Sequence, residues 1–163
     1  MIKTNHSRWL PVLVLWLAVL FGPAVRAAAP VILVLGDSLS AAYGIPVEQG
    51  WVGLLQGRLV ERGFPHRVVN ASISGDTSSG GRSRLPALLA QHRPSVVVIE
   101  LGGNDALRGL PLEMTRDNLL AMTTAAQQAG ARVLLLGMQV PPNYGPDYTR
   151  RFAAVFEAVA TQR

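Results

Sequence analysis

The sequence VILVLGDS, residues 31–38, decides the fold of this chain. An apolar run followed at once by a glycine and two polar residues is typical of a strand that is buried on both faces and ends in a polar turn. A serine in that turn, Ser38, stands at the end of a buried strand and can serve as a nucleophile. The alternative is a plain strand-to-helix connection in which Asp37 or Ser38 caps exposed N–H groups.

Apolar runs of strand length alternate with longer amphipathic stretches along the rest of the chain. This alternation favours β-α-β units, and therefore an α/β fold with a parallel sheet covered on both faces. We expect strands at residues 31–35, 67–71, 96–101 and 132–138. We expect helices where apolar side chains recur at helical spacing: within residues 48–62, around Leu85, Leu88 and Leu89, and over residues 113–129 and 147–161.

The first 27 residues differ in character from the rest. Lys3 and Arg8 precede an apolar run at residues 9–21, and small residues close the segment before Pro30. This order predicts a signal peptide over residues 1–27 that is cleaved on export. A membrane span is the alternative, but the run is shorter than the roughly 20 apolar residues that a span needs. We therefore expect a domain over residues 28–163, in a periplasmic or secreted protein with no stable membrane span after cleavage.

Composition narrows the choice of partners. With 163 residues, 49% of them hydrophobic and 15% charged, the chain fits one globular domain with a sizeable core. The formal charge of +5 includes Lys3, Arg8 and Arg26 of the expected signal peptide, and the other 12 basic residues face 10 acidic ones. Because the arginines are scattered, we expect no nucleic-acid partner. The absence of cysteine excludes disulfides and thiolate metal sites. We also expect the protein to be a monomer.

Two further polar turns follow apolar runs of their own, Gly75-Asp76-Thr77 and the turn at residues 102–105. All three turns leave the carboxyl ends of parallel strands, and this end of an open α/β sheet is where ligands bind. The Gly75 backbone N–H can approach a reacting carbonyl because no side chain intervenes, and Asn104 offers a side-chain amide. The Pro-rich loop at residues 141–146 should cross the same end. The turns therefore predict a serine nucleophile with an oxyanion hole.

The acidic residues near these turns have other interpretations. Asp76 and Thr77 can cap the helix that follows them, and Asp105 can order its own turn. The three aspartates, Asp37 included, could instead hold a hard cation such as magnesium, as in a metal-dependent phosphoesterase. Glu100 ends an apolar strand, so burial would raise its pKa, and a structural hydrogen bond is the simpler expectation for its carboxyl group. Residues 36–40 also lack the second glycine of the Gly-x-Ser-x-Gly elbow, which disfavours an ordinary α/β-hydrolase.

The chain resembles the SGNH, or GDSL-type, hydrolases, and within them the periplasmic esterases of the thioesterase I, lysophospholipase L1 and arylesterase group. The resemblance runs from residue 31 to the last residue. It is carried by GDSLSA at residues 36–41, VNASISGDT at 69–77, RLPALL at 84–89, ELGGND at 100–105 with LRG at 107–109, and PNYG at 142–145.

The resemblance implies a flavodoxin-like three-layer α/β/α fold and hydrolysis of acyl esters or thioesters through an acyl-enzyme. It implies Ser38 as the nucleophile, and an oxyanion hole made of the Ser38 N–H, the Gly75 N–H and the Asn104 side chain. The implied substrate is a small-molecule or lipid acyl ester, and neither a cofactor nor a metal is expected.

Members of this family carry an Asp-x-x-His motif close to the C-terminus that supplies the general base, and residues 1–163 contain no such motif. His66 and His92 precede strands, so we expect both at the opposite end of the sheet. A strand of that length spans about 17 Å, whereas a general base must lie within about 3 Å. We therefore expect a C-terminally incomplete chain, lacking its last strand and helix, with little or no activity. The alternative is a non-catalytic acyl- or lipid-binding remnant of the fold.

Overall fold

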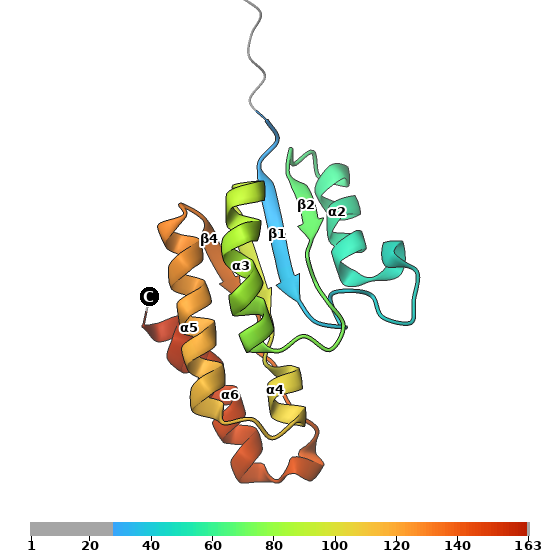
Figure 1. Ribbon diagram of the computed structural model, residues 1–163. Helices are drawn as coiled ribbons and strands as arrows, with labels where there is room; N and C mark the ends of the chain where they lie inside the picture. The colour runs from blue at the N-terminus through green and yellow to red at the C-terminus, as the bar shows by residue number, and fades with distance from the viewer. Residues whose placement is uncertain (1–27, 163) are drawn as a thin grey trace, which may run out of the picture.

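A parallel sheet lies at the centre of the computed structural model, which describes residues 28–162; the expected signal peptide, residues 1–27, lies outside the described residues. β1 (Val31–Gly36) pairs with β2 (Arg67–Asn70) on one side and with β3 (Val96–Glu100) on the other, and β4 (Arg132–Leu135) lies beyond β3 (Figure 1). The strand order is β2-β1-β3-β4, and every pair is parallel, as predicted.

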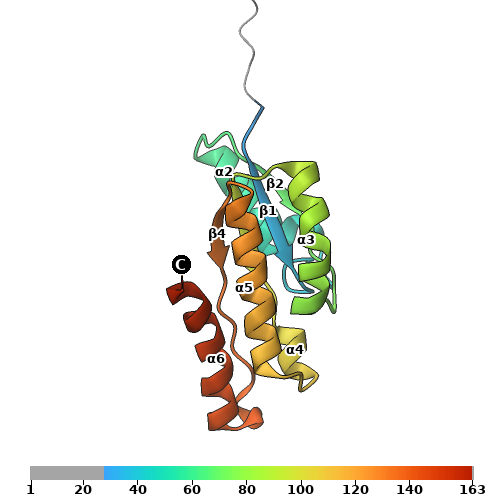
Figure 2. The ribbon, with the colours of Figure 1, turned by 60° about the vertical axis from the view of Figure 1, so that its left-hand side comes forward.

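Alternate residues of the strands face two different helical layers. Leu33 and Leu35 of β1 belong to an apolar core shared with α3 (Ser78–His92), α5 (Leu112–Gln128) and α6 (Pro146–Thr161). Val34 points to the other face and packs with residues of α2 (Trp51–Glu61). Figures 1 and 2 show α3 and α5 side by side over the first face. The result is the three-layer α/β/α arrangement that the sequence predicts.

The last strand differs from its prediction. Residues 132–138 were expected to form one strand, but β4 ends at Leu135. The Leu136 N–H still donates to the Ile99 carbonyl oxygen at 2.9 Å, and the chain then leaves the sheet because β3 itself ends one residue later, at Glu100. On the face that α2 covers, Leu134 of β4 stays 51% exposed. An apolar run thus overstated the length of the strand.

Three short elements have no counterpart in the prediction: η1 (Val47–Gln49), α4 (Gly103–Leu107) and η2 (Pro142–Tyr144). Each has five residues or fewer, too few to show helical spacing. α4 begins directly after Gly102, whose φ of 119° suits a residue without a side chain. The four longer helices lie within a few residues of the predicted ranges, apart from the earlier start of α3 at Ser78.

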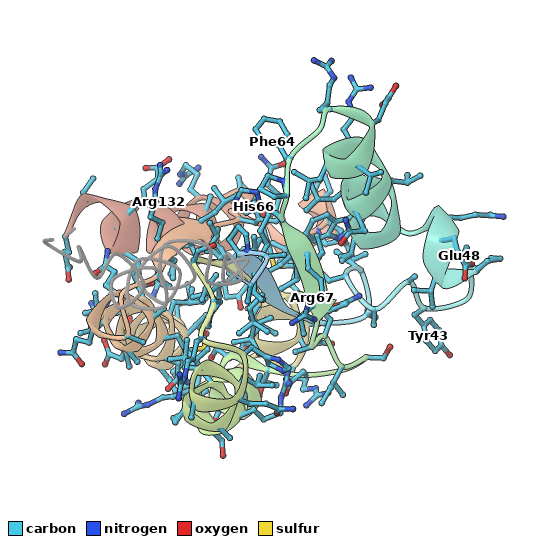
Figure 3. The ribbon with its side chains drawn as sticks, turned by 90° about the horizontal axis from the view of Figure 1, so that it is seen from above. Tyr43, Glu48, Phe64, His66, Arg67 and Arg132 are labelled. Atoms are coloured by element: carbon cyan, nitrogen blue, oxygen red, sulfur yellow. The ribbon has the colours of Figure 1, made fainter. Side chains whose placement is uncertain are left out.

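The two ends of the sheet carry different residues. The loops that follow the strands all lie at the carboxyl end, toward the bottom of Figure 1. His66 directly precedes β2, and His92 ends α3 ahead of β3, so both lie at the amino end, as predicted. Figure 3 looks onto this end and shows His66 between Phe64 and Arg67. Among residues 28–162, none of the helices has the length and apolar content that crossing a membrane requires.

Candidate active site

Ser38 lies in the tight turn that follows β1. The Ala41 N–H donates to the Asp37 carbonyl oxygen at 2.9 Å, and the Leu39 N–H donates to Asp37 Oδ1 at 3.0 Å. Ser38 itself is half-buried. Within residues 28–162, neither its hydroxyl nor its backbone N–H has a hydrogen-bond partner in the protein. Both groups are therefore free to meet a ligand at the carboxyl end of the sheet.

Asn104 connects the three turns that follow β1, β2 and β3. It is the second residue of α4, and its side-chain Nδ2 donates to Asp37 Oδ2 at 3.0 Å and to the Asp76 carbonyl oxygen at 2.9 Å. The turns after β1, β2 and β3 therefore meet at one side chain, which confirms that they share one end of the sheet. Both amide hydrogens of Asn104 are engaged in this arrangement.

Gly75 has a backbone conformation that suits glycine. Its φ is +79°, in the left-handed region, where a side chain would be strained. The exposed Arg108, directly after α4, donates from Nη2 to the Gly75 carbonyl oxygen at 2.8 Å and so ties this turn to the loop after β3. The Gly75 N–H has no acceptor in the part of the chain that the structure describes.

The capping prediction for the turn after β2 is half correct. Thr77 is the N-cap of α3, because its Oγ1 accepts from the Gly80 N–H at 3.3 Å. Asp76 does not cap α3. Its Oδ2 instead accepts from Arg84, at 2.6 Å from Nη2 and 3.1 Å from Nε, while Arg84 Nη1 donates to the Ala71 carbonyl oxygen at 2.7 Å. The arginine of the RLPALL motif thus holds the turn at both ends.

The prediction that Asp105 orders its own turn is wrong. Its buried carboxylate reaches the start of α3, where it accepts from the Ser78 N–H at 2.8 Å and from the Ser78 hydroxyl at 2.5 Å. The Ser78 Oγ accepts in turn from Asn118 Nδ2 of α5 at 3.0 Å. Because a carboxylate at a helix N-terminus satisfies unpaired N–H groups there, Asp105 fastens α4, and with it Asn104, to α3 and α5.

Two carboxyl groups lie buried beside the Ser38 turn. Asp37 is 3% exposed and Glu100 is 5% exposed. Burial raises the pKa of Glu100 above its ordinary value, and the hydrogen bond from the Ser40 hydroxyl partly offsets this effect. Burial also raises the pKa of Asp37, the Leu39 N–H lowers it, and the nearby Asp76 raises it further. The prediction of a raised pKa and of a structural hydrogen bond at Glu100 is confirmed.

The three aspartates do not converge on one point. Asp76 faces Arg84, Asp105 faces Ser78, and Asp37 faces Asn104. Within residues 28–162, no group of three or more histidine, cysteine, aspartate or glutamate side chains is placed to hold a metal ion. Each carboxylate instead accepts a hydrogen bond from a different partner.

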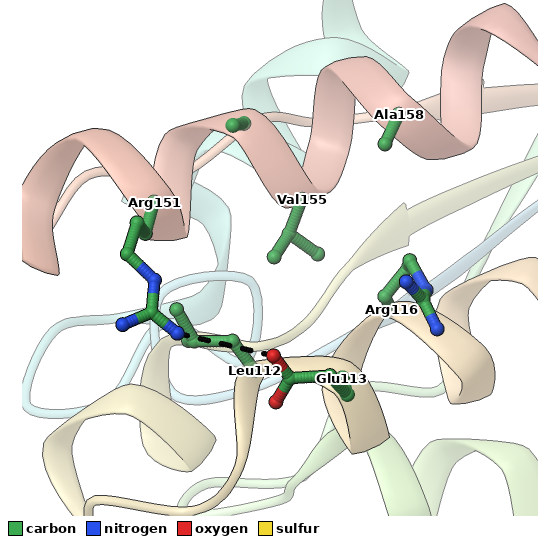
Figure 4. Close-up of a pocket in the computed structure, with 7 residues that line it drawn as sticks. Leu112, Glu113, Arg116, Arg151, Val155 and Ala158 are labelled. Carbon is green, nitrogen blue, oxygen red and sulfur yellow. Dashed lines mark ion pairs between the residues drawn. The ribbon is translucent and has the colours of Figure 1, made fainter.

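A pocket of about 310 Å³ opens next to the Ser38 turn. Its walls are mainly apolar and come from the turn after β1, the start of α2, and the chain that leaves β4: Leu39, Trp51, Glu100, Leu136, Gly137, Met138 and Gln139. A separate hollow of about 220 Å³ lies between α5 and α6, where Arg151 Nη2 approaches Glu113 Oε1 at 3.8 Å (Figure 4). None of the residues that line this hollow belongs to the three turns.

Comparison with known proteins places this geometry among esterases. Residues 34–163 match the model of the GDSL-like lipase/acylhydrolase family. The chain is similar to esterase TesA of Pseudomonas aeruginosa, with 59% identity over 84% of this chain and 68% of that protein. It is also similar to thioesterase 1/protease 1/lysophospholipase L1 of Escherichia coli, with 44% identity over 83% of this chain and 64% of that protein. The chain thus spans about two thirds of the length of these relatives.

The fold agrees with this similarity. The structure superposes on the crystal structure of TesA with a TM-score of 0.80 and 59% sequence identity, covering 81% of this chain and 73% of that chain.

Proposed function

The chain belongs to the GDSL-like lipase/acylhydrolase family of serine hydrolases that act on ester bonds, and we propose that it hydrolyses acyl esters or thioesters through an acyl-enzyme on Ser38. The observation that carries the proposal is the meeting of three turns at Asn104, beside a serine whose hydroxyl is unengaged. In the proposed reaction, the Ser38 hydroxyl loses its proton as Oγ bonds to the carbonyl carbon, and the bond to the leaving group breaks as that group takes up a proton and departs as the alcohol or thiol. Water then cleaves the acyl-serine bond and releases the acid.

We propose that the oxyanion hole consists of the Ser38 N–H, the Gly75 N–H and the Asn104 side chain. The two backbone N–H groups support this assignment because both lack an acceptor among the described residues. Asn104 is different, because its two amide hydrogens already bind Asp37 Oδ2 and the Asp76 carbonyl oxygen. A substrate oxyanion would therefore replace one of these acceptors when it forms. Removing one donor from such a hole typically slows catalysis about 100-fold to 1,000-fold.

The proton of the Ser38 hydroxyl needs a base. The histidines among residues 28–162 are His66 and His92, which lie at the other end of the sheet. We therefore expect slow acylation by residues 28–162 alone, at a rate set by the oxyanion donors. The apolar pocket beside Leu39 is the proposed place for the acyl or leaving group, because Leu39 directly follows the nucleophile.

Labelling with a fluorophosphonate tests the proposal. We expect one slowly formed adduct, located on Ser38 by peptide mass spectrometry after long incubation, and none in Ser38→Ala. Ser74→Ala is the matched control, because Ser74 is an exposed serine of the neighbouring turn, and its labelling should equal that of the unchanged protein. An adduct that persists in Ser38→Ala, or no adduct at all, would contradict the proposal.

The second candidate is a non-catalytic acyl-binding domain, and the location of His66 and His92 away from Ser38 favours it. The two candidates differ in turnover. Hydrolysis of a p-nitrophenyl acyl ester well above the rate of Ser38→Ala would exclude the binding domain, whereas binding of a fatty acid without Ser38-dependent turnover would support it.

We also propose export to the periplasm or out of the cell as a monomer. The basic, apolar and small-residue regions of residues 1–27 support cleavage before the domain. The N-terminus of the protein secreted from intact cells, determined by mass spectrometry, should lie close to residue 28, and light scattering should give the mass of one chain. An N-terminus at Met1 would contradict the signal peptide.

A further inference from the structure

Glu100, the last residue of β3, contacts the Ser38 turn on both sides of the serine. We propose that Glu100 is a positioning residue, whose carboxylate fixes Ser38 by accepting from the Asp37 N–H before it and from the Ser40 hydroxyl after it. The inference rests on the proposed role of Ser38 as nucleophile, because it states how the nucleophile is held.

Both contacts go to the same carboxylate oxygen. The Ser40 hydroxyl donates to Glu100 Oε2 at 2.6 Å, and the Asp37 N–H donates to Oε2 at 3.4 Å. Glu100 and Ser40 are 5% and 1% exposed, so water does not compete for these bonds. In the sheet register Glu100 is the partner of Gly36, the last residue of β1, and the carboxylate therefore lies where the chain turns toward Ser38.

Gly36 shows how closely the carboxylate approaches the turn. A Cβ atom at this position would lie 2.5 Å from Ser40 Oγ and 2.8 Å from Glu100 Oε2. Any side chain there would push the two groups apart. Glycine inside a strand weakens the strand, and it often marks a close approach of another group. The first glycine of the GDSLSA motif thus makes room for the bond between Glu100 and Ser40.

Ser40 passes this restraint to neighbouring elements. Its Oγ accepts from Trp51 Nε1, at the start of α2, at 3.2 Å, and its carbonyl oxygen accepts from Asn70 Nδ2, at the end of β2, at 2.7 Å. Together with Glu100, these contacts tie Ser40 to β3, α2 and β2 at once. The backbone of Ser38, two residues earlier, has little freedom left.

A carboxylate is a costly group to bury here. Glu100 Oε1 is buried without a hydrogen-bond partner among the described residues, and an unsatisfied buried acceptor destabilises the folded state. An ionised acceptor forms hydrogen bonds roughly twice as strong as a neutral one does. Packing alone does not explain a buried acid at this position. Its role as a strong hydrogen-bond acceptor for the turn does explain it.

Two substitutions at Glu100 separate acceptor strength from packing. Glu100→Gln keeps an oxygen acceptor of the same length, and Glu100→Leu removes it. Misplacement of a nucleophile by about 1 Å can cost about 100-fold in rate, so we expect fluorophosphonate labelling of Ser38 to slow about 100-fold in Glu100→Leu and less than about 10-fold in Glu100→Gln. Glu113→Gln, on an exposed acid of α5, should change nothing.

Amide hydrogen exchange gives a readout that does not depend on activity. In Glu100→Leu, we expect the amides of residues 37–41 to exchange at least about 10-fold faster while those of β1 stay protected. Gly36→Ala should have the same effect with the carboxylate still present, since the added Cβ blocks the bond. Glu100→Gln should keep the exchange of residues 37–41 close to that of the unchanged protein.

The outcomes separate this inference from the proposed function. If Ser38 is never labelled, the proposed function fails, and exchange of residues 37–41 still decides whether Glu100 holds the turn. If Glu100→Leu does not fold, Gly36→Ala and Glu100→Gln decide it. Unchanged exchange and labelling in folded Glu100→Leu, or in Gly36→Ala, would overturn the proposal, as would faster exchange spread evenly over the whole domain.

Discussion

The carboxyl and amino ends of the central sheet are joined to the rest of the fold in different ways. At the carboxyl end, side chains bind loops distant in sequence, as Asn104 binds Asp37 and Asp76, and as Glu100 binds Ser40. At the amino end, backbone contacts such as the Arg67 N–H donating to the Pro30 carbonyl oxygen at 2.9 Å join the strands, and the side chains of Gln56 and Ser95 bond to backbone groups beside them.

This difference determines how much stability a substitution costs at each end of the sheet. A buried polar group at the carboxyl end is compensated only while its partner is present, and removing one partner leaves the other unsatisfied. A backbone contact at the amino end survives a change of side chain. We therefore expect substitutions at the carboxyl end to be costly and those at the amino end to be tolerated.

Asp105→Ala is the largest expected break at the carboxyl end. It removes the acceptor of both the Ser78 N–H and the Ser78 hydroxyl, which are buried. An unsatisfied buried donor costs about 1–3 kcal/mol, so the free energy of unfolding, measured by urea titration with circular dichroism, should fall by about 3 kcal/mol. Asp105→Asn keeps one acceptor oxygen and should lose about half as much. A loss below about 1 kcal/mol in the alanine variant would contradict the role of Asp105.

Arg84→Met should have the next largest effect. The Arg84 side chain is 26% exposed and that of Asp76 is 11% exposed, and their contact is joined by the bond to the Ala71 carbonyl oxygen. We expect a loss of about 1–2 kcal/mol in the same titration, because the charged hydrogen bonds are partly screened by water. The control is Arg58→Met, whose ion pair with Glu61 is exposed, and it should lose less than about 0.5 kcal/mol. Equal losses of unfolding free energy in Arg84→Met and Arg58→Met would contradict the expected difference between the two ends.

The buried acids give the carboxyl end a pH dependence of smaller size. Burial raises the pKa of Glu100 above its ordinary value of 4.5. The folded protein therefore holds this proton more tightly than the unfolded chain does, so the stabilisation is fully present below the ordinary pKa and is lost as pH rises through the raised pKa. Glu100→Gln has no such proton. Between about pH 4 and about pH 8 its free energy of unfolding should fall less than that of the unchanged protein, and parallel pH profiles would speak against the raised pKa.

Substitutions of the histidines at the amino end should have the smallest effect. His66 and His92 lie at the opposite end of the sheet from Ser38. The rate of fluorophosphonate labelling in His66→Gln and in His92→Gln should stay within about twofold of the unchanged protein, because a general base must lie within about 3 Å of the hydroxyl that it deprotonates. A loss of more than about tenfold in either variant would show that the two ends communicate.

The sequence predicts the first three strands well, both the largely buried β1 and β3 and the edge strand β2, whose residues are exposed or half-buried. The predicted strands at residues 31–35, 67–71 and 96–101 differ from β1, β2 and β3 by one residue. The prediction fails at residues 136–138, because apolar composition reports burial and not strand pairing. Leu136 and Met138 line the pocket beside Ser38 after the chain has left the sheet.

The site is predicted in part. Ser38, Gly75 and Asn104 lie on turns at the predicted end of the sheet, and their roles remain predictions. The structural roles of Ser40 and Arg84 were not predicted. Ser40 lies 60 positions from its partner Glu100, and no local sequence pattern pairs Arg84 with Asp76. The one feature of the sequence that pointed to the contact with Ser40 was Glu100, an acid at the end of an apolar strand. Gly36, its partner in the neighbouring strand, leaves room for the carboxylate.

The central place of β1 also bears on the order in which the protein folds. The strands of the sheet are all parallel, so no two of them can pair through a tight hairpin. β1 can therefore pair only after β2, and then β3, has been synthesised. Contacts between such distant segments are slow to form. Ser38 is thus among the first residues of the domain to be synthesised, but Asn104, which draws its neighbouring turns together, is added some 66 residues later. The proposed active site can assemble only after most of the sheet already exists.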